Sequence, residues 1–282
     1  MKTYQDCIPC FFKQALRAGN IATSNKAKIR QLMNEVEILL EKISWENTPP
    51  ETGALIYQKI REITGNPDPF QKIKANNIAH ALKLYPALKR LVQSSNDPLL
   101  AAVRLAIAGN VIDLGVDKKF DLETEIEQIM QKQFAVFDYE FFKRELSSAR
   151  KILYLGDNAA EAVFDRILME ELGKPVIFAV RGIPVINDIT LKEAETIGID
   201  RIAEVISSGS IAPGTVLHYC NQKFIHEFNN ADLIISKGQG NFEGLSSVDR
   251  SVFFLLKAKC KVIADHIGVQ ENDILLKGIN LQ

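Results

Sequence analysis

The residues best suited to chemistry are Asp157 and Asn158, which directly follow the short apolar run 152–155. That run predicts a strand covered on both faces, and helically spaced apolar residues after the corner predict a helix. In open α/β sheets, ligands bind at the carboxyl ends of strands, beside the positive end of the following helix. A carboxylate and a carboxamide at this corner, with Glu161 one turn further on, therefore predict a site for a hard divalent cation.

Two more loops follow predicted strands and would meet the first at one edge of the sheet. The second contains Arg181, which could contact phosphate or pair with an acidic neighbour, and Asp188, whose simplest role is to cap the next helix. The third loop, 236–243, joins Lys237 to a Gly-x-Gly turn. Glycines let backbone N–H groups approach an anion and the lysine supplies a charge, so this loop predicts a phosphate cradle. It matches neither the Walker loop nor the dinucleotide fingerprint.

Together the three loops predict a metal-assisted phosphatase acting through a metal-bound water. Two carboxylates and one amide carbonyl would hold a single Mg²⁺ or Mn²⁺ and leave positions for water and a phosphate oxygen. The predicted metal ligands are Asp157, Asn158 and Asp188. The predicted catalytic residues are these three and Lys237, and the predicted substrate-binding residues of the loops are Glu161, Lys237, Gly238, Gly240 and Asn241. The sequence does not identify the general base.

Further motifs accompany these loops in the amino-terminal half. Cys7 and Cys10 form a Cys-x-x-Cys pair, and Asn110 and Asp113 form a Gly-Asn-x-x-Asp segment. In this combination the chain resembles the damage-control phosphatase family, metal-dependent enzymes that hydrolyse phosphorylated metabolites such as sugar phosphates. The cysteine pair looks like that of the family's Cys-x-x-Cys subgroup. Ala160 departs from the pattern, since glycine is commoner there.

The resemblance implies a small phosphorylated metabolite as substrate and a divalent cation, Mn²⁺, Mg²⁺, Co²⁺ or Ni²⁺, as cofactor. It assigns the Asp-Asn pair and Asp188 to the metal, and it assigns the loop 237–241 to the substrate pocket. The resemblance also implies that Asn110 and Asp113 are substrate-binding residues of that pocket. The implied fold is a helical bundle joined to a three-layer α/β/α domain.

Periodicity predicts the same two-part organisation. Residues 1–148 read as a mostly α-helical domain, and residues 149–282 read as an α/β/α metal-binding catalytic domain with a mostly parallel sheet. Candidate strands are 152–155, 176–180, 203–206, 232–236, 261–264 and, as a possible addition, 274–276. Helices are expected from Cys7 onwards and at 26–40, 53–63, 70–85, 99–107, 123–133, 139–146, 161–172, 192–197, 222–228 and 247–258, with a short one within 214–219.

Composition limits the classes of partner. A net charge of −1 and a pI near 6.5 give no electrostatic footprint for nucleic acid. No apolar run approaches the roughly 20 residues that a membrane span needs, and the first residues lack the apolar core of a secretion signal. We therefore expect a cytoplasmic protein that binds neither nucleic acid nor membranes, and the sequence leaves the oligomeric state open.

Several alternatives stay open at this level. The same loops would suit a metal-dependent module that binds phosphometabolites, or regulates through them, without turnover. A nucleotide-dependent transferase on a doubly wound sheet is disfavoured because the first strand lacks the Gly-x-Gly-x-x-Gly turn. Cys7 and Cys10 would share a helix face, as a redox pair, as half of a soft-metal site or as packing residues. The four histidines show no metal-ligand spacing.

Overall fold

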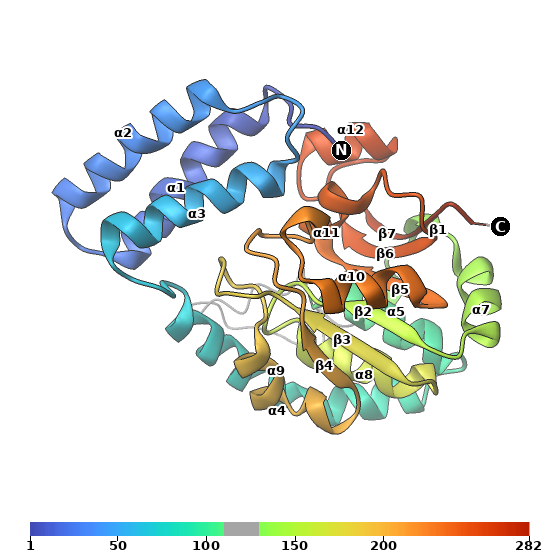
Figure 1. Cartoon of the computed structure of the whole chain (residues 1–282). Helices are drawn as coiled ribbons and strands as arrows, with labels where there is room; N and C mark the ends of the chain where they lie inside the picture. Colours follow the sequence, from blue (N-terminus) through green and yellow to red (C-terminus); the bar gives the residue numbers. More distant parts are fainter. Residues whose placement is uncertain (110–129, 282) are drawn as a thin grey trace.

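The computed structural model describes residues 1–109 and 130–281, which form an α/β domain with three further helices at one side (Figure 1). Seven strands make one sheet in the order β1-β7-β6-β5-β2-β3-β4. All neighbours pair in parallel except β6 and β7, which are antiparallel. The strands are β1 (Phe134–Phe137), β2 (Ile152–Leu155), β3 (Val176–Val180), β4 (Glu204–Ser207), β5 (Leu233–Lys237), β6 (Val252–Lys257) and β7 (Ile274–Ile279).

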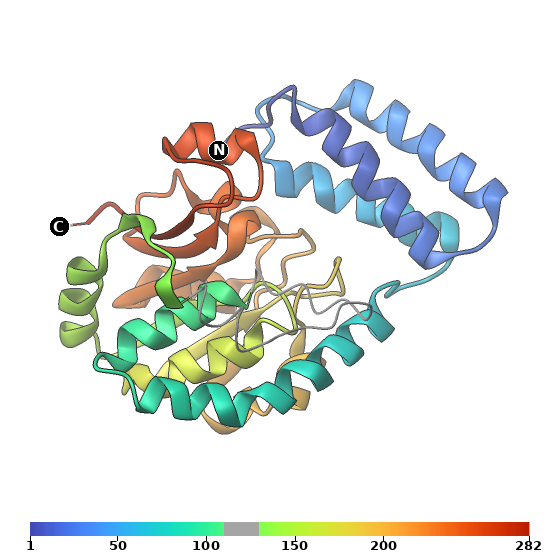
Figure 2. The same ribbon diagram turned by 180° about the vertical axis from the view of Figure 1, so that it is seen from behind.

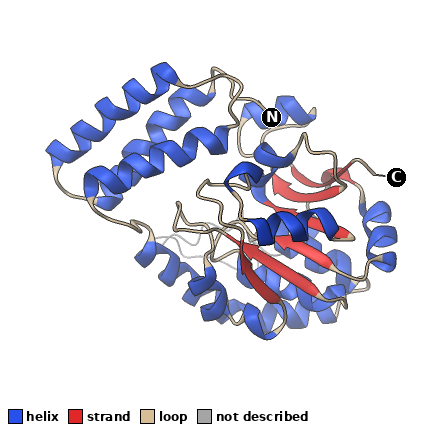
Figure 3. Ribbon diagram, viewed as in Figure 1, coloured by secondary structure: helices blue, strands red, loops and turns tan. Residues whose placement is uncertain are grey.

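Helices cover both faces of this sheet, as Figure 3 shows with the strands in red. Alternate strand residues such as Tyr154 and Phe178 belong to a core shared with α4 (Gln71–Gln93), α5 (Pro98–Ala108), α7 (Tyr139–Ser148), α8 (Ala162–Leu172) and α9 (Leu191–Ile197). Figure 2 shows α4, α5 and α8 lying over that face. The strand residues that point to the opposite face of the sheet, such as Leu155, pack with α10 (Gln222–Asn230), α11 (Gly238–Leu245) and α12 (Lys261–Ile267). The predicted three-layer α/β fold is confirmed.

The three remaining helices, α1 (Cys7–Ala22), α2 (Lys26–Lys42) and α3 (Pro49–Thr64), form what we call the helical cap. Local signals fix their starts: Asn25 caps α2, and Thr48 and Glu51 form a capping box on α3. The cap has an apolar core of its own, which Val185 from the loop after β3 completes. The cap therefore rests on the loop that carries Asp188.

Three expectations about single elements are wrong. The stretch 247–258, predicted as a helix, contains β6, and 261–264, predicted as a strand, starts α12. The run Val252–Leu256 is completely buried in the sheet, and periodicity does not distinguish a buried strand from a buried helix. Helix α4 also continues beyond Pro86, because Leu88 and Val92 pack in the core of the sheet face. The predicted helix at 123–133 lies mostly outside the described residues.

The sheet also draws on chain that precedes residue 148. Strand β1, which the sequence did not predict, pairs with β7 at the sheet edge, and α4, α5 and α7 pack on the sheet. The predicted boundary at 148/149 therefore does not coincide with the edge of the sheet domain, since the cap alone has a separate core. Over the described residues, no helix is both long and apolar enough to span a membrane.

The assignment of β6 predicts a large cost for cavity formation at its centre. Leu255 is completely buried between two neighbouring strands, so Leu255→Ala should lower the free energy of unfolding by about 2–5 kcal/mol in urea titrations. Leu191 is 49% exposed, so Leu191→Ala should change it by less than about 0.5 kcal/mol. Equal effects of the two substitutions would contradict the placement of β6 inside the sheet.

Candidate active site

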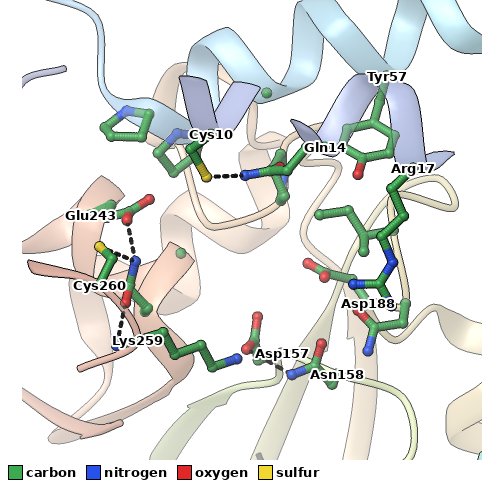
Figure 4. A pocket seen from close by; sticks show the side chains of 18 of the residues that line it. Cys10, Gln14, Arg17, Tyr57, Asp157, Asn158, Asp188, Glu243, Lys259 and Cys260 are labelled. Atoms are coloured by element: carbon green, nitrogen blue, oxygen red, sulfur yellow. Dashed lines mark hydrogen bonds between the residues drawn. The ribbon is translucent and has the colours of Figure 1, made fainter. Parts of the chain in front are cut away.

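The corner after β2 is joined to the loop after β3 by backbone hydrogen bonds. The N–H of Ile189 donates to the carbonyl of Asp157, and the N–H of Ala159 donates to that of Asn187, both at 2.8 Å. Asn158 and Asp188 thereby form an isolated antiparallel bridge. The structure thus brings Asp157, Asn158 and Asp188 together, and all three line one pocket (Figure 4).

The amide of Asn158 is oriented by two acceptors. Its Nδ2 donates to Asp157 Oδ2 at 3.2 Å and to Glu161 Oε2 at 3.0 Å. Because the amide nitrogen faces these carboxylates, the amide oxygen faces away from them. That oxygen is a type of atom that can coordinate a cation. These two hydrogen bonds therefore fix the orientation of the Asn158 side chain.

Arg181 holds the two carboxylates of the site from behind. Its side chain is 2% exposed, and Nε donates to Asp188 Oδ2 at 2.6 Å while Nη2 lies 3.5 Å from Asp157 Oδ1. The same Nη2 donates to Asn241 Oδ1 at 3.0 Å. The guanidinium is engaged with protein acceptors, so Arg181 positions the carboxylates. Of the two roles that the sequence left open, the structure shows the pairing with acidic neighbours.

Burial raises the pKa of Asp188 to about 7, and repulsion from Asp157 adds to the rise while Arg181 opposes it. A divalent cation would relieve this repulsion. Oxygen donors from two carboxylates and one amide fit a hard cation such as Mg²⁺ or Mn²⁺. Within residues 1–109 and 130–281, no three His, Cys, Asp or Glu side chains are arranged to hold a metal ion. A cation here would therefore depend on the carbonyl of Asn158 as its third protein ligand.

Lys237 does not lie where the predicted phosphate contact requires. Its ammonium group, 0% exposed, donates to Glu161 Oε1, to Asp165 Oδ1 at 2.5 Å and to the carbonyl of Ala106 at 2.6 Å. Tyr154 donates to the same oxygen of Asp165 at 2.7 Å. The lysine sits beneath the pocket because two buried carboxylates need a buried cation. Lys237 donates to Glu161, and Glu161 in turn accepts a hydrogen bond from the amide of Asn158. Lys237 therefore affects the site indirectly.

The predicted phosphate loop is the first turn of α11. Gly238 has φ +78°, and a Cβ there would lie 1.9 Å from Asp157 Oδ2, so glycine is required beside the carboxylate. Asn241 is completely buried, and its Nδ2 donates to the carbonyls of Gly156 and Lys237 at 3.2 and 2.8 Å. Of the predicted substrate residues in this turn, Gly240 lines the pocket, whereas Gly238 and Asn241 are not among its lining residues.

The pocket has a volume of about 1120 Å³ and lies between the helical cap and the carboxyl edge of the sheet. Sequence reasoning missed several side chains that line it: Arg17 and Tyr57 from the cap, Glu243 from α11, and Lys259 from the turn after β6. Arg17 and Tyr57 fall within predicted helices, Glu243 ends the predicted third loop, and Lys259 follows the predicted helix 247–258. The places of Arg17 and Tyr57 in the pocket depend on how the cap docks, which no local pattern encodes.

Comparison with known proteins decides the family. A family model described as "Damage-control phosphatase ARMT1-like domain" matches residues 3–275. The chain belongs to this family. A damage-control phosphatase of Pyrococcus horikoshii is 36% identical over 282 aligned residues, covering 98% of this chain and 97% of its own length. A damage-control phosphatase of Archaeoglobus fulgidus is 32% identical over 98% of this chain and 99% of its own length.

The solved structures agree with this assignment. A crystal structure of a DUF89 family protein from Pyrococcus horikoshii matches the chain with a TM-score of 0.91 at 34% identity, covering 98% of each chain. The resemblance seen in the sequence and the expected fold are thus both confirmed. The chain is accordingly a member of a family of phosphatase enzymes.

Two further motifs of the damage-control phosphatase pattern remain to be placed. Asn110 and Asp113 lie outside the described residues. Cys7 and Cys10 line the pocket together with Cys260, and all three are free thiols. Burial raises the pKa of the Cys7 thiol, which keeps it protonated near neutral pH. Cys10 Sγ accepts a hydrogen bond from Gln14 Nε2 at 3.2 Å.

The raised pKa of Asp188 predicts how cation binding responds to pH. Below about pH 7 a proton occupies this carboxyl, and a cation binds only after the proton leaves. The affinity for Mn²⁺, measured by calorimetry, should fall as the pH falls from 8 to 6 and approach a tenfold loss per pH unit below 7. Asp188→Asn should bind Mn²⁺ weakly and without this slope. An unchanged affinity of the wild type across that range would contradict the assignment.

The Lys237 contacts predict a stability defect. Lys237→Met leaves Glu161 and Asp165 buried without a cation, so urea unfolding at pH 8 should show a loss of about 3–5 kcal/mol. The triple variant with Glu161→Gln and Asp165→Asn should recover part of that loss. Lys223, exposed and paired with Glu204, is the control, and Lys223→Met should cost less than about 1 kcal/mol. A loss no larger than that of the control would refute the buried network.

Proposed function

We propose that this chain is a metal-dependent phosphatase that hydrolyses small phosphorylated metabolites, sugar phosphates or related damaged metabolites among them. The observation that carries the proposal is the convergence of Asp157, Asn158 and Asp188 on one pocket. The relatives from Pyrococcus horikoshii and Archaeoglobus fulgidus, both named damage-control phosphatases, support the reaction class. The substrate class and the metal requirement are our proposals for this chain.

In this proposal Asp157, Asn158 and Asp188 hold the divalent cation, Mn²⁺, Mg²⁺, Co²⁺ or Ni²⁺. When bound there, such a cation supplies Lewis acidity towards a phosphoryl oxygen. The protein's own work is to keep the three ligands converged before binding. Arg181 holds both carboxylates, and Glu161, fixed by Lys237, holds the amide of Asn158. Ligands fixed in this way lose little conformational freedom when they bind.

A phosphatase also needs a group that moves protons near neutral pH. Glu243 lines the pocket and accepts a hydrogen bond from Gln239 Nε2 at 2.8 Å. Burial raises its pKa to about 7, while the nearby charge of Lys259 opposes the rise. Neither Arg181 nor Lys237 forms an ion pair with it within the described parts of the chain. We assign to Glu243 the proton exchange with water or with the leaving oxygen.

The proposal is tested by phosphate release from a panel of sugar phosphates and other phosphomonoesters. Chelator-treated protein should be inactive, and at least one of Mn²⁺, Mg²⁺, Co²⁺ or Ni²⁺ should restore turnover. Asp157→Asn and Asp188→Asn should each lower kcat/KM by about a hundredfold or more, since each removes a charged ligand. Asp200→Asn, at an exposed position outside the pocket, is the matched control and should retain activity.

Other outcomes separate the alternatives. Turnover that survives both chelation and Asp157→Asn would overturn the proposed mechanism. Tight binding of cation and phosphate without release from any ester would instead favour a binding or regulatory module. A nucleotide-dependent transferase would need binding of nucleotides in a thermal-shift panel, and the carboxylates of Asp157 and Asp188 would repel a pyrophosphate at this corner.

A further inference from the structure

The buried cations of the site are already engaged with protein groups, which raises the question of what binds the substrate's phosphate. Arg181 contacts Asp157, Asp188 and Asn241, and Lys237 contacts two carboxylates and a carbonyl. Moving either side chain to a phosphate would leave buried carboxylates without partners, at a cost of several kcal/mol. A phosphate dianion must therefore meet other cations.

Three basic residues, Arg17, Lys259 and Lys261, line the pocket and are exposed, and the first two extend towards predicted metal ligands. Within the described residues, neither Arg17 nor Lys259 forms a side-chain hydrogen bond or an ion pair, and both are exposed. They come from opposite walls, Arg17 from α1 of the cap and Lys259 from the turn between β6 and α12. Figure 4 shows the Lys259 side chain extending towards Asp157 and the Arg17 guanidinium extending towards Asp188.

The position of Lys259 is built into the fold. Its backbone N–H donates to Gln239 Oε1 at 2.9 Å, while Gln239 Nε2 donates to Glu243 at 2.8 Å. One glutamine thus ties the turn that carries Lys259 to α11.

Tyr57 supplies a polar group beside Arg17. Its ring is buried, with the residue 4% exposed, and it lines the same pocket. Burial and the charge of Asp188 raise the pKa of Tyr57, while Arg17 opposes the rise. The hydroxyl therefore stays protonated at neutral pH and can donate a hydrogen bond to an anionic oxygen.

We propose that Arg17 and Lys259 bind the substrate's phosphate from opposite walls of the pocket, with the hydroxyl of Tyr57 donating to the same anion. The inference rests on the proposed function and names the phosphate subsite of that pocket. The subsite is complete only when cap and sheet domain face each other, since each provides one cation. It selects a phosphomonoester dianion, because two separate charges meet oxygens on two sides.

The charge balance of the pocket supports this subsite. Five carboxylic acids line it, Asp6, Asp157, Glu161, Asp188 and Glu243, against three basic residues, Arg17, Lys259 and Lys261. Arg181 and Lys237, buried outside the lining, already pair with Asp157, Asp188 and Glu161, and a divalent cation would add further positive charge. Loss of Arg17 or Lys259 would make the pocket more negative and would therefore weaken the binding of a dianion. Phosphate binding should therefore need both the divalent cation and these side chains.

The test measures binding of inorganic phosphate to Mn²⁺-loaded protein by calorimetry. Arg17→Gln and Lys259→Gln should each raise the Kd for phosphate by about tenfold or more, with less than about a threefold change in the Kd for Mn²⁺. Lys259→Arg should recover most of the phosphate affinity, because the charge is kept. Arg30→Gln and Lys192→Gln, which remove exposed charges outside the pocket, are the controls and should leave both constants unchanged.

Phosphate affinities of Arg17→Gln and Lys259→Gln within about twofold of the controls would overturn the inference. A parallel loss of Mn²⁺ affinity would do the same, since it would assign these residues to the structure of the metal site. The proposed function fails on a different result, the absence of phosphate release by the wild type from every ester. Phosphate release that stays intact while phosphate binding ignores Arg17 and Lys259 would leave the function standing without this subsite.

Discussion

The structure depends on the burial of several carboxylates at the carboxyl end of one sheet. Asp157, Asp188, Glu161 and Asp165 all lie at or below the pocket floor, where water screens their mutual repulsion poorly. Two buried cations answer this charge: Arg181 pairs with the first two carboxylates and Lys237 with the other two. An arrangement of this kind does not maximise stability. It is consistent with the cation site that we propose for this pocket.

The fold supplies the close approaches that such a site needs. Gly238 lets the backbone of α11 pass directly beneath the carboxylate of Asp157, where any Cβ would collide. Asn241, one turn later, ties that helix to the end of β2 through the carbonyl of Gly156. The glycines and the amide of this motif thus bring two strand ends together. In the subsite that we propose, side chains on the pocket walls bind the phosphate.

Sequence reasoning reached the parts of the site that local signals encode. The polar residues Asp157, Asn158 and Asp188 each follow an apolar strand run, and parallel topology alone places such residues at one edge. The partner of Lys237 was not predictable in this way. Lys237 pairs with Asp165 because α8 packs on the sheet in a way that brings that carboxylate to it. In the sequence, a lysine that pairs with protein and one that binds a ligand look the same beside glycines.

The remaining errors have similar causes. Val252–Leu256 and Lys261–Ile267 exchange helix and strand because a short, fully buried apolar run carries no period that separates the two. Arg17 and Tyr57 escaped notice because their helices are amphipathic for packing within the cap. Only the docking of the cap on the loop around Val185 turns those positions towards the site. These features depend on tertiary packing between distant parts of the chain, and local sequence patterns therefore could not predict them.

The central claim is that Asp157, Asn158 and Asp188 share one cation. Anomalous diffraction from crystals grown with Mn²⁺ addresses it most directly. The account predicts a single strong anomalous peak with one oxygen of each of the three side chains at about 2.0–2.3 Å, the amide oxygen of Asn158 included. A peak bound elsewhere, or one that leaves the Asn158 oxygen or Asp188 uncoordinated, would contradict it.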